Sequence, residues 1–404
     1  MEGFCISLAT IPYLYHLSLV GLGVIVIWLL AKFRKLALDP IARWGFMLLS
    51  GLLALNVVVA VDRGEAFLQL ANFFPFFGWF GVLPFLLKGI ERLEQVAMAL
   101  VLGSLPINVI SVGEYILKAP WMPRDIRRLP WVAWVRSAPH KGRAMMMFGH
   151  PNAMASYLVV ILGLGLGLIL YDWVQRRSAI APATPPSPWL RLKPVALYLA
   201  TFLNLVGIFT AGSRNGLVIA IGQLLVFVLF ARRHQRVVMT GLVGLVAVIG
   251  GAVALGIGGR SLLLSTWTSD PRIRVWQIAL EMTQSRPWLG WGLGSYKLLY
   301  PSYPHDPEYS YIGHPHNFWL LLSSEAGLPV MLLFTGLVGY CCYRGARAVM
   351  LTPKPIEQAL FWGYAIAFAG CIGFSLFDVT LYNAQLNLVN WLVLAGIYSF
   401  ARSQ

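Results

Sequence analysis

The chain has 404 residues, of which 58% are hydrophobic and only 12% are charged, and its mean hydropathy is +0.69. Soluble domains carry about a quarter charged residues, so this composition excludes a soluble globular protein and predicts an all-α protein that crosses a membrane many times. Lys and Arg outnumber Asp and Glu by 31 to 16. In a membrane protein this excess points to cytoplasmic topology signals, anionic lipid or an anionic substrate, and not to nucleic acid.

Apolar runs close to the ~20 residues that span a bilayer recur along the whole chain. They predict about eleven transmembrane helices, with residues 1–12 as an interfacial piece or part of a twelfth. The run at 67–87 contains Pro75 and Pro84, so we expect it to be kinked. The predicted spans are 13–31, 44–61, 67–87, 95–113, 151–173, 194–211, 215–231, 237–258, 317–342, 359–377 and 385–401.

The cysteines and the N-terminus add two expectations. Each of the four cysteines lies in or beside an apolar segment, so no disulfide framework is predicted. The N-terminus has no basic region followed by a cleavage site, so we expect no removable signal peptide.

Basic residues concentrate in alternate loops between the predicted spans, and this orients the chain. One set of loops carries clusters of Lys and Arg, whereas the short loops of the opposite set carry only Arg63 and Arg214. The positive-inside rule therefore places the first set and the C-terminus in the cytoplasm. The two long loops, 114–150 and 259–316, are then extracytoplasmic. We expect a single integral membrane domain over residues 1–404, with both long loops on one side.

The first long loop is rich in tryptophan and basic residues, among them Arg143. This composition suits the lipid headgroup layer, where indole and guanidinium groups both find partners, so the loop could be an interfacial anchor. It could also be a clamp for an anionic, lipid-borne substrate. The loop ends with His150-Pro151, and the proline opens the next predicted helix.

The second long loop contains a predicted helix. Asp270 is suited to the N-cap and Pro271 to the first helical position, and the apolar spacing predicts a helix to about Gln284. This helix carries Arg272 and Arg274 at its start. Such a helix would lie on the membrane or against the helix bundle.

Two further motifs follow in this loop. The Gly-Trp-Gly-Leu-Gly run at 290–294 has no preceding strand, so it predicts a tight turn and not a dinucleotide site. The loop closes with His314-Pro315-His316-Asn317. A proline one place into an apolar run is a helix-start signal, which predicts that His316 lies in the first turn of a helix.

Three predicted helices begin on the extracytoplasmic side with a basic or titratable residue, namely His150, Arg214 and His316. The partial positive charge of a helix N-terminus disfavours a cation there. An anion bound between the helix ends would resolve this conflict, because N-terminal N–H groups and guanidinium groups both bind phosphate. A neutral imidazole at His316 could accept a proton beside that anion. The three residues therefore predict a functional site.

Metal binding competes with this interpretation at His314 and His316. Their spacing across a proline is not that of a helical ligand pair, and no Cys or Glu stands at a zinc-like distance, so no metal is predicted. Glu325 is nine residues beyond His316 and is better explained as a buried structural acid. Asp378, at the extracytoplasmic end of the 359–377 span, is better placed to support His316.

Four sequence elements occur in order between about residues 140 and 390. They are Phe148-Gly149-His150-Pro151-Asn152; Gly212-Ser213-Arg214-Asn215-Gly216; Arg272-Ile273-Arg274-Val275-Trp276 with Arg286-Pro287-Trp288-Leu289-Gly290-Trp291-Gly292; and His316-Asn317, then nine residues, then Gly327-Leu328-Pro329-Val330. Together they resemble the O-antigen ligase and polymerase superfamily of bacterial inner-membrane glycosyltransferases. Val330 stands where the ligase pattern has Gly, Thr or Tyr. The 145–155 stretch is similar to cyanobacterial members.

The resemblance implies a reaction and a set of roles. The donor would be a glycan on undecaprenyl diphosphate, and the acceptor a hydroxyl of a lipid or glycan at the periplasmic face of the inner membrane. His316 would be the general base, and no metal or cofactor would be required. The implied substrate-binding residues are Arg214 and Arg272 for the diphosphate, then Arg274, Arg143, Asn317 and His150.

Alternatives remain open at the level of sequence, and transfer of the glycan to a protein is one of them. A polymerase of the same superfamily would use a second lipid-linked repeat unit as its acceptor. A transporter of a bicarbonate-type anion would also suit a basic extracytoplasmic face, and some cyanobacterial relatives have been labelled as inorganic-carbon transporters. Transporters place polar groups and broken helices near the membrane midplane, whereas the conspicuous charges here cluster at one surface, which favours the enzyme.

Overall fold

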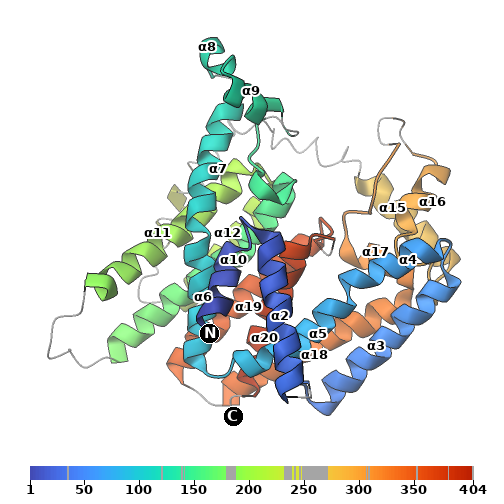
Figure 1. Ribbon diagram of the computed structural model, residues 1–404, viewed down its shortest axis with the longest axis horizontal. Coiled ribbons are helices and arrows are strands. Elements are labelled where there is room, and N and C mark those ends of the chain that lie inside the picture. Colours follow the sequence, from blue (N-terminus) through green and yellow to red (C-terminus); the bar gives the residue numbers. More distant parts are fainter. Residues whose placement is uncertain are drawn as a thin grey trace. The chain divides into compact units, whose positions relative to one another are not determined.

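All regular elements in the part of the chain that the computed structural model describes are helices, which confirms the all-α fold class (Figure 1). The described residues are 1–33, 36–119, 122–137, 140, 142–178, 188–231, 239–240, 243–244, 247, 272–305, 307, 310–351, 354–380 and 382–402.

Eight helical segments among these residues are long and apolar enough to cross a membrane, so the chain is a multi-pass membrane protein. Two shorter apolar helices, Arg214–Phe230 and Ala384–Phe400, match two further predicted spans. The predicted span 237–258 lies almost entirely outside the described residues. The eight segments are Tyr15–Phe33, Pro40–Val59, Arg63–Leu86, Ile90–Lys118, Pro151–Arg177, Leu192–Thr210, Leu328–Leu351 and Pro355–Ser375.

The helices form two compact units, each built from three stretches of chain. The first unit comprises Met1–Val24, Gly89–Leu262 and Val349–Cys371, and the second comprises Ile25–Lys88, Leu263–Ala348 and Ile372–Gln404. The expectation of a single domain over residues 1–404 stays a prediction.

The first unit is built around α10 (Pro151–Ser178), whose most apolar window is 94% buried. Along this helix, small residues let a neighbouring backbone approach closely. A Cβ atom at Gly163 or Gly167 would collide with the backbone of α19 (Pro355–Ser375) at Ala367 or Gly363. Among the described residues, this unit also contains the first part of α2 (Tyr15–Phe33) and the helices α1 (Glu2–Thr10), α6 (Ile90–Gly103), α7 (Leu105–Lys118), α8 (Arg124–Arg127), α9 (Pro130–Ser137), η2 (Met146–Phe148), α11 (Pro188–Thr210) and α12 (Arg214–Phe230).

The second unit contains an aromatic core between three of its helices. Phe46 of α3 (Pro40–Val59), Phe80 of α5 (Phe74–Leu86) and Trp391 of α20 (Ala384–Phe400) have ring centroids 5.4 to 5.9 Å apart. The kink predicted in the 67–87 run is confirmed, because the run is divided between α4 (Arg63–Gln69), η1 (Leu70–Asn72) and α5. The part of this unit that the structure describes also contains the later part of α2, together with α15 (Arg272–Ser285), α16 (Tyr296–Leu299), η4 (Tyr300–Ser302), α17 (Phe318–Ala326) and α18 (Leu328–Leu351).

Asp39 joins three helices of the second unit at one end. It is the N-cap of α3, where its side chain accepts a hydrogen bond from the Ala42 N–H at 3.1 Å. The same carboxylate accepts hydrogen bonds from Tyr398 of α20 at 2.7 Å and from Tyr340 of α18 at 3.2 Å. The Arg344 guanidinium, also on α18, lies 3.1 Å from it. One carboxylate thus links the start of α3 to the interior of α18 and to the end of α20.

Replacing Asp39 by alanine is expected to lower the free energy of unfolding by about 1–3 kcal/mol, because a cap and hydrogen bonds to a charged group are lost together. Burial alone would raise the pKa of Asp39, but the hydrogen bonds that its carboxylate accepts and the charge of Arg344 hold that pKa below its usual value. A depressed pKa stabilises the fold above the unfolded-state pKa of about 3.9, and this stabilisation is lost as the pH falls through the folded-state value. Thermal unfolding in detergent across this pH range measures both effects.

Asp62 provides the matched control. It is also an aspartate N-cap, of α4, and its side chain accepts from the Glu65 N–H at 2.9 Å in an exposed position. Asp62→Ala is expected to cost about 1 kcal/mol, the value of a cap alone. Equal losses in the two variants would show that the tyrosines and Arg344 add nothing to the role of Asp39.

Candidate functional site

His316 lies immediately before a short buried helix, α17. The helix begins at Phe318, and its N-cap is Asn317, whose side chain accepts from the Leu320 N–H at 3.0 Å. The prediction that Pro315 opens the helix with His316 in its first turn is therefore wrong, because the amide of Asn317 caps the helix two residues later. His316 instead has a φ of +51°, in the left-handed region that few residues other than glycine adopt. Such local strain is typical of functional sites.

The side chain of His316 is paired with Asp378, as the sequence predicted. The His316 Nδ1 and Asp378 Oδ1 atoms are 3.2 Å apart, and the two side chains are 31% and 13% exposed. The Val379 N–H also donates to Asp378 Oδ1, at 2.9 Å, and this orients the carboxylate. A carboxylate can only accept, so we assign the imidazole proton to Nδ1, which leaves the lone pair of Nε2 available to accept a proton.

The two His-Pro pairs of the sequence make the same local hydrogen bond, although only the first opens a helix. In the first, the Asn152 N–H donates to His150 Nδ1 at 3.1 Å, and in the second the His316 N–H donates to His314 Nδ1 at 3.3 Å. The imidazole two residues upstream therefore receives a backbone N–H in both places. The role of His314 in positioning His316 was missed at the sequence level, although the repeated His-Pro pattern was a signal for it.

His314, His316 and Asp378 also form a cluster with the donors of a metal site. Each offers one ligand atom, and these atoms lie within 4.8 Å of one another. Among the described residues, no other group of three or more His, Cys, Asp or Glu side chains has this geometry. Sequence spacing did not predict it, because the third ligand comes from a loop 62 residues beyond His316.

Arg143 is buried in the first unit, beside the turn that carries Arg214. It is 6% exposed, its Nε donates to the Ala211 carbonyl at 2.8 Å, and its Nη2 donates to Asn152 Oδ1 at 2.9 Å. The guanidinium thus lies at the carboxyl end of α11, where the helix dipole favours a cation. These contacts give Arg143 a structural role in joining α11 to the start of α10.

Arg214 is the first residue of α12, close to the predicted helix start. Ser213 caps this helix by accepting from the Gly216 N–H at 3.3 Å. The preceding Gly212 has a φ of +58°, and a Cβ atom there would lie 3.2 Å from the Arg143 side chain. The structure therefore places Arg143 against the turn that carries Arg214 in the first unit.

The other predicted arginines lie on α15 in the second unit. Arg272 is its first described residue, and the predicted cap at Asp270 lies outside the described residues. Arg274 forms an ion pair with Glu281 at 2.9 Å and donates to the Pro304 carbonyl at 2.8 Å. Because Glu281 already balances its charge, Arg274 is a weaker candidate for binding an anion than its position in the sequence suggested.

The carboxyl end of α17 is closed by the glycine-rich loop that follows α15. The Trp291 N–H donates to the Ser324 carbonyl at 3.1 Å, and the Gly292 N–H donates to the Glu325 carbonyl at 2.8 Å. Carbonyl groups that a helix end leaves without intrahelical partners are satisfied in this way. The predicted continuous span 317–342 is therefore wrong, because the helix breaks between α17 and α18.

Two glycines make this closure possible. A Cβ atom on Gly290 would collide with the Glu325 carbonyl, and one on Gly327 would collide with the Trp288 carbonyl. Gly290, Gly292 and Gly294 all have positive φ, which confirms the predicted tight turn. The two motifs that the sequence presented separately, around Gly290 and around Gly327, are thus parts of one substructure.

The side chain of Glu325 belongs to this substructure as well. It is 2% exposed, Oε1 accepts from the Tyr296 N–H at 2.9 Å, and Oε2 accepts from the Tyr382 hydroxyl at 3.4 Å. These contacts confirm Glu325 as a buried structural acid that does not orient His316.

Gly327→Ala is expected to destabilise the protein more than Gly89→Ala. The two glycines have almost the same backbone conformation, with φ and ψ of +87° and 164° at Gly327 and of +85° and 155° at Gly89. A Cβ atom at Gly89 has nothing within 4 Å, so that variant measures the backbone strain alone, about 1–3 kcal/mol. Thermal unfolding in detergent compares the two variants. Equal shifts of the unfolding midpoint would show that the Trp288 carbonyl adds nothing to the cost of a side chain at Gly327.

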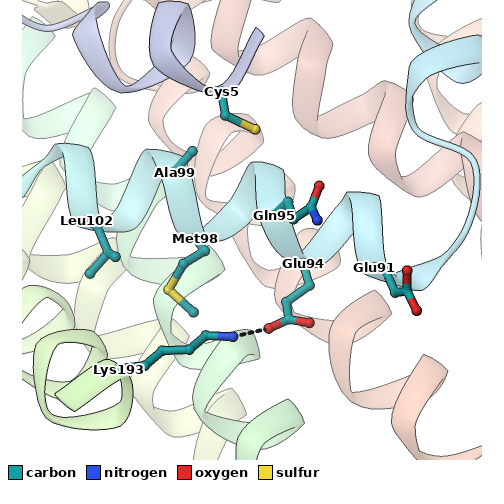
Figure 2. A pocket seen from close by; sticks show the side chains of 8 residues that line it. All are labelled: Cys5, Glu91, Glu94, Gln95, Met98, Ala99, Leu102 and Lys193. Atoms are coloured by element: carbon teal, nitrogen blue, oxygen red, sulfur yellow. Dashed lines mark hydrogen bonds and ion pairs between the residues drawn. The ribbon is translucent and has the colours of Figure 1, made fainter. Parts of the chain in front are cut away.

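A cavity of about 430 Å³ opens in the first unit (Figure 2). Glu94 and Lys193 form an ion pair of 2.6 Å at its wall. None of the predicted site residues lines this cavity, so it does not support the predicted chemistry. The lining residues are Cys5, Glu91, Glu94, Gln95, Met98, Ala99, Leu102 and Lys193.

The fold and the site define a multi-pass, all-α membrane protein with a histidine–carboxylate pair before a short buried helix. Residues 199–335 match the family model described as O-antigen ligase, which confirms for this segment the resemblance to the O-antigen ligase and polymerase superfamily. Of the predicted site residues, Arg143 and His150 precede the matched segment and the others lie within it. A comparison with curated protein sequences found no match.

Proposed function

We propose that the protein is a membrane glycosyltransferase that moves a glycan from undecaprenyl diphosphate to an acceptor hydroxyl at the periplasmic face of the inner membrane. The pair formed by His316 and Asp378 carries this proposal, because the carboxylate orients the imidazole as a base. The family match of residues 199–335 supports the reaction class.

His316 acts as the general base in the proposed reaction. Its Nε2 takes the proton of the acceptor hydroxyl while the hydroxyl oxygen attacks the anomeric carbon of the donor. The bond between this carbon and the diphosphate oxygen breaks, and the diphosphate leaves with the electron pair. Asp378 stabilises the imidazolium that forms, through the proton on Nδ1.

The leaving diphosphate needs positive charge, and we propose Arg272, which belongs to the same unit as His316, for this role. Arg214 belongs to the first unit, and its part in binding the diphosphate stays a prediction from the sequence. Guanidinium groups bind phosphate oxygens with two parallel hydrogen bonds and remain charged at all relevant pH values. Arg143 and Arg274 are weaker candidates, since one is engaged with helix ends and the other with Glu281. Fixed cations of this kind stabilise developing negative charge without a metal ion.

His316→Asn is expected to lower the rate of transfer by about 10²- to 10⁴-fold, the usual contribution of a general base. Asparagine tolerates the positive φ of this position, so the substitution removes the base with little change to the backbone. The assay is transfer from a purified lipid-diphosphate glycan by the full chain in detergent with EDTA. His16→Ala, at an exposed position, is the control and should transfer at the wild-type rate.

Full activity of His316→Asn would rule out this residue as the base. No transfer by the wild type, together with uptake of bicarbonate into proteoliposomes, would contradict the transferase proposal and favour transport. A product with one donor glycan on a non-polymeric acceptor identifies a ligase, whereas repeat units added to one another identify a polymerase.

Asp378→Asn is expected to lower kcat at least about tenfold and to leave KM nearly unchanged, because a neutral amide no longer stabilises the imidazolium in the transition state. The carboxamide can still accept the hydrogen bonds from His316 and Val379, so the thermal unfolding midpoint should remain within a few degrees of the wild type. A rise in KM with an unaltered kcat would show instead that Asp378 helps to bind substrate.

A further inference from the structure

We propose that His314, His316 and Asp378 bind one zinc ion, and that the bound ion holds the enzyme inactive. The inhibitory half of this inference rests on the proposed function of His316, whereas the binding half does not. The cluster lies within the second unit, so all three ligands come from one compact body.

The donor set suits zinc. Two imidazoles and one carboxylate form a ligand set that zinc takes readily, with a fourth position left for water. Tetrahedral zinc with bonds of about 2.0–2.1 Å separates neighbouring ligand atoms by about 3.3 Å. The Nδ1 of His316 and the Oδ1 of Asp378 are already 3.2 Å apart. One ligand atom from each of the three residues lies within 4.8 Å of the others, so the three side chains are close enough to share one ion.

The backbone around the ligands limits their freedom, which lowers the entropic cost of binding a metal. Pro315 fixes the chain between the two histidines, and their ring centroids are 4.6 Å apart. The Val379 N–H orients the Asp378 carboxylate at 2.9 Å. His314 Nδ1 carries no proton, since it accepts from the His316 N–H. Zinc at that atom would replace this long hydrogen bond of 3.3 Å.

Zinc at His316 would remove the base by changing its tautomer. In the metal-free site the proton is on Nδ1 and the lone pair of Nε2 is available. Coordination uses the lone pair of Nδ1, so the single proton of the neutral imidazole must reside on Nε2. An Nε2–H group donates a hydrogen bond and cannot take a proton from the acceptor hydroxyl. Binding zinc and acting as the base are therefore mutually exclusive.

Direct binding tests the site without any assay of transfer. The full chain in detergent is stripped with EDTA, freed of the chelator and titrated with Zn²⁺ by calorimetry, and with Co²⁺ as a spectroscopic probe of tetrahedral coordination. One equivalent should bind to the wild type. His314→Ala and Asp378→Asn should each bind Zn²⁺ at least tenfold more weakly. Even the loss of a residue that only holds a metal ligand in place lowers metal affinity about 10- to 100-fold. His16→Ala should bind like the wild type.

The transfer assay then tests inhibition, as the ratio of rates with and without saturating Zn²⁺ within each variant. The wild-type rate should fall at least tenfold and recover with EDTA, whereas the ratio for His314→Ala should stay near one at the same zinc concentration. Equal binding by wild type and both ligand variants, or faster transfer with zinc, would overturn the inference. Binding that depends on the cluster in a protein without transfer activity would instead refute the proposed function and leave the zinc site standing.

Discussion

The position of the candidate base depends on a helix that ends inside the protein. Helix α17 has nine residues, and its last turn is buried. If the carbonyl groups of this turn had no hydrogen-bond donors, the folded state of a membrane protein would be destabilised by several kcal/mol. The loop around Gly290 supplies these donors, and the side chain of Asn56 adds another to the Glu325 carbonyl at 3.0 Å. With one end held in this way and the other capped by Asn317, α17 gives His316 a fixed place.

The features that the sequence predicted well are those set by local chemistry. The apolar runs defined the spans, Pro75 explained the kink before α5, and the position of Asp378 after an apolar run predicted its pairing with His316. The left-handed backbone of His316 could not be predicted, because a proline at position 315 is equally consistent with a helix start. The break at Gly327 also escaped prediction, since an apolar run continues on both sides and the steric reason for the break is the Trp288 carbonyl, 39 positions earlier in the sequence.

Arg143 and Arg274 show why charge alone does not define a binding residue. Both were predicted to bind substrate, but each already makes hydrogen bonds or an ion pair within the protein. Arg143 neutralises the carboxyl end of α11, and Arg274 pairs with Glu281. Cations at helix ends and in short ion pairs stabilise the scaffold that presents other groups. Their substitution would therefore change stability and activity together, and only a measurement that separates the two assigns a role.

The burial of α10 has a consequence for how the chain is assembled in the membrane. This helix is apolar enough to insert by itself, yet 94% of its most apolar window is covered in the folded unit. Gly163 and Gly167, which pack against α19, lie about 200 residues before their contacts on that helix. During synthesis this glycine-bearing face of α10 must therefore be solvated by lipid until α19 has been made. The close approach of Gly167 to Gly363 then requires that lipid be displaced from this face of α10. The first unit can reach its final packing only after the C-terminal part of the protein has entered the bilayer.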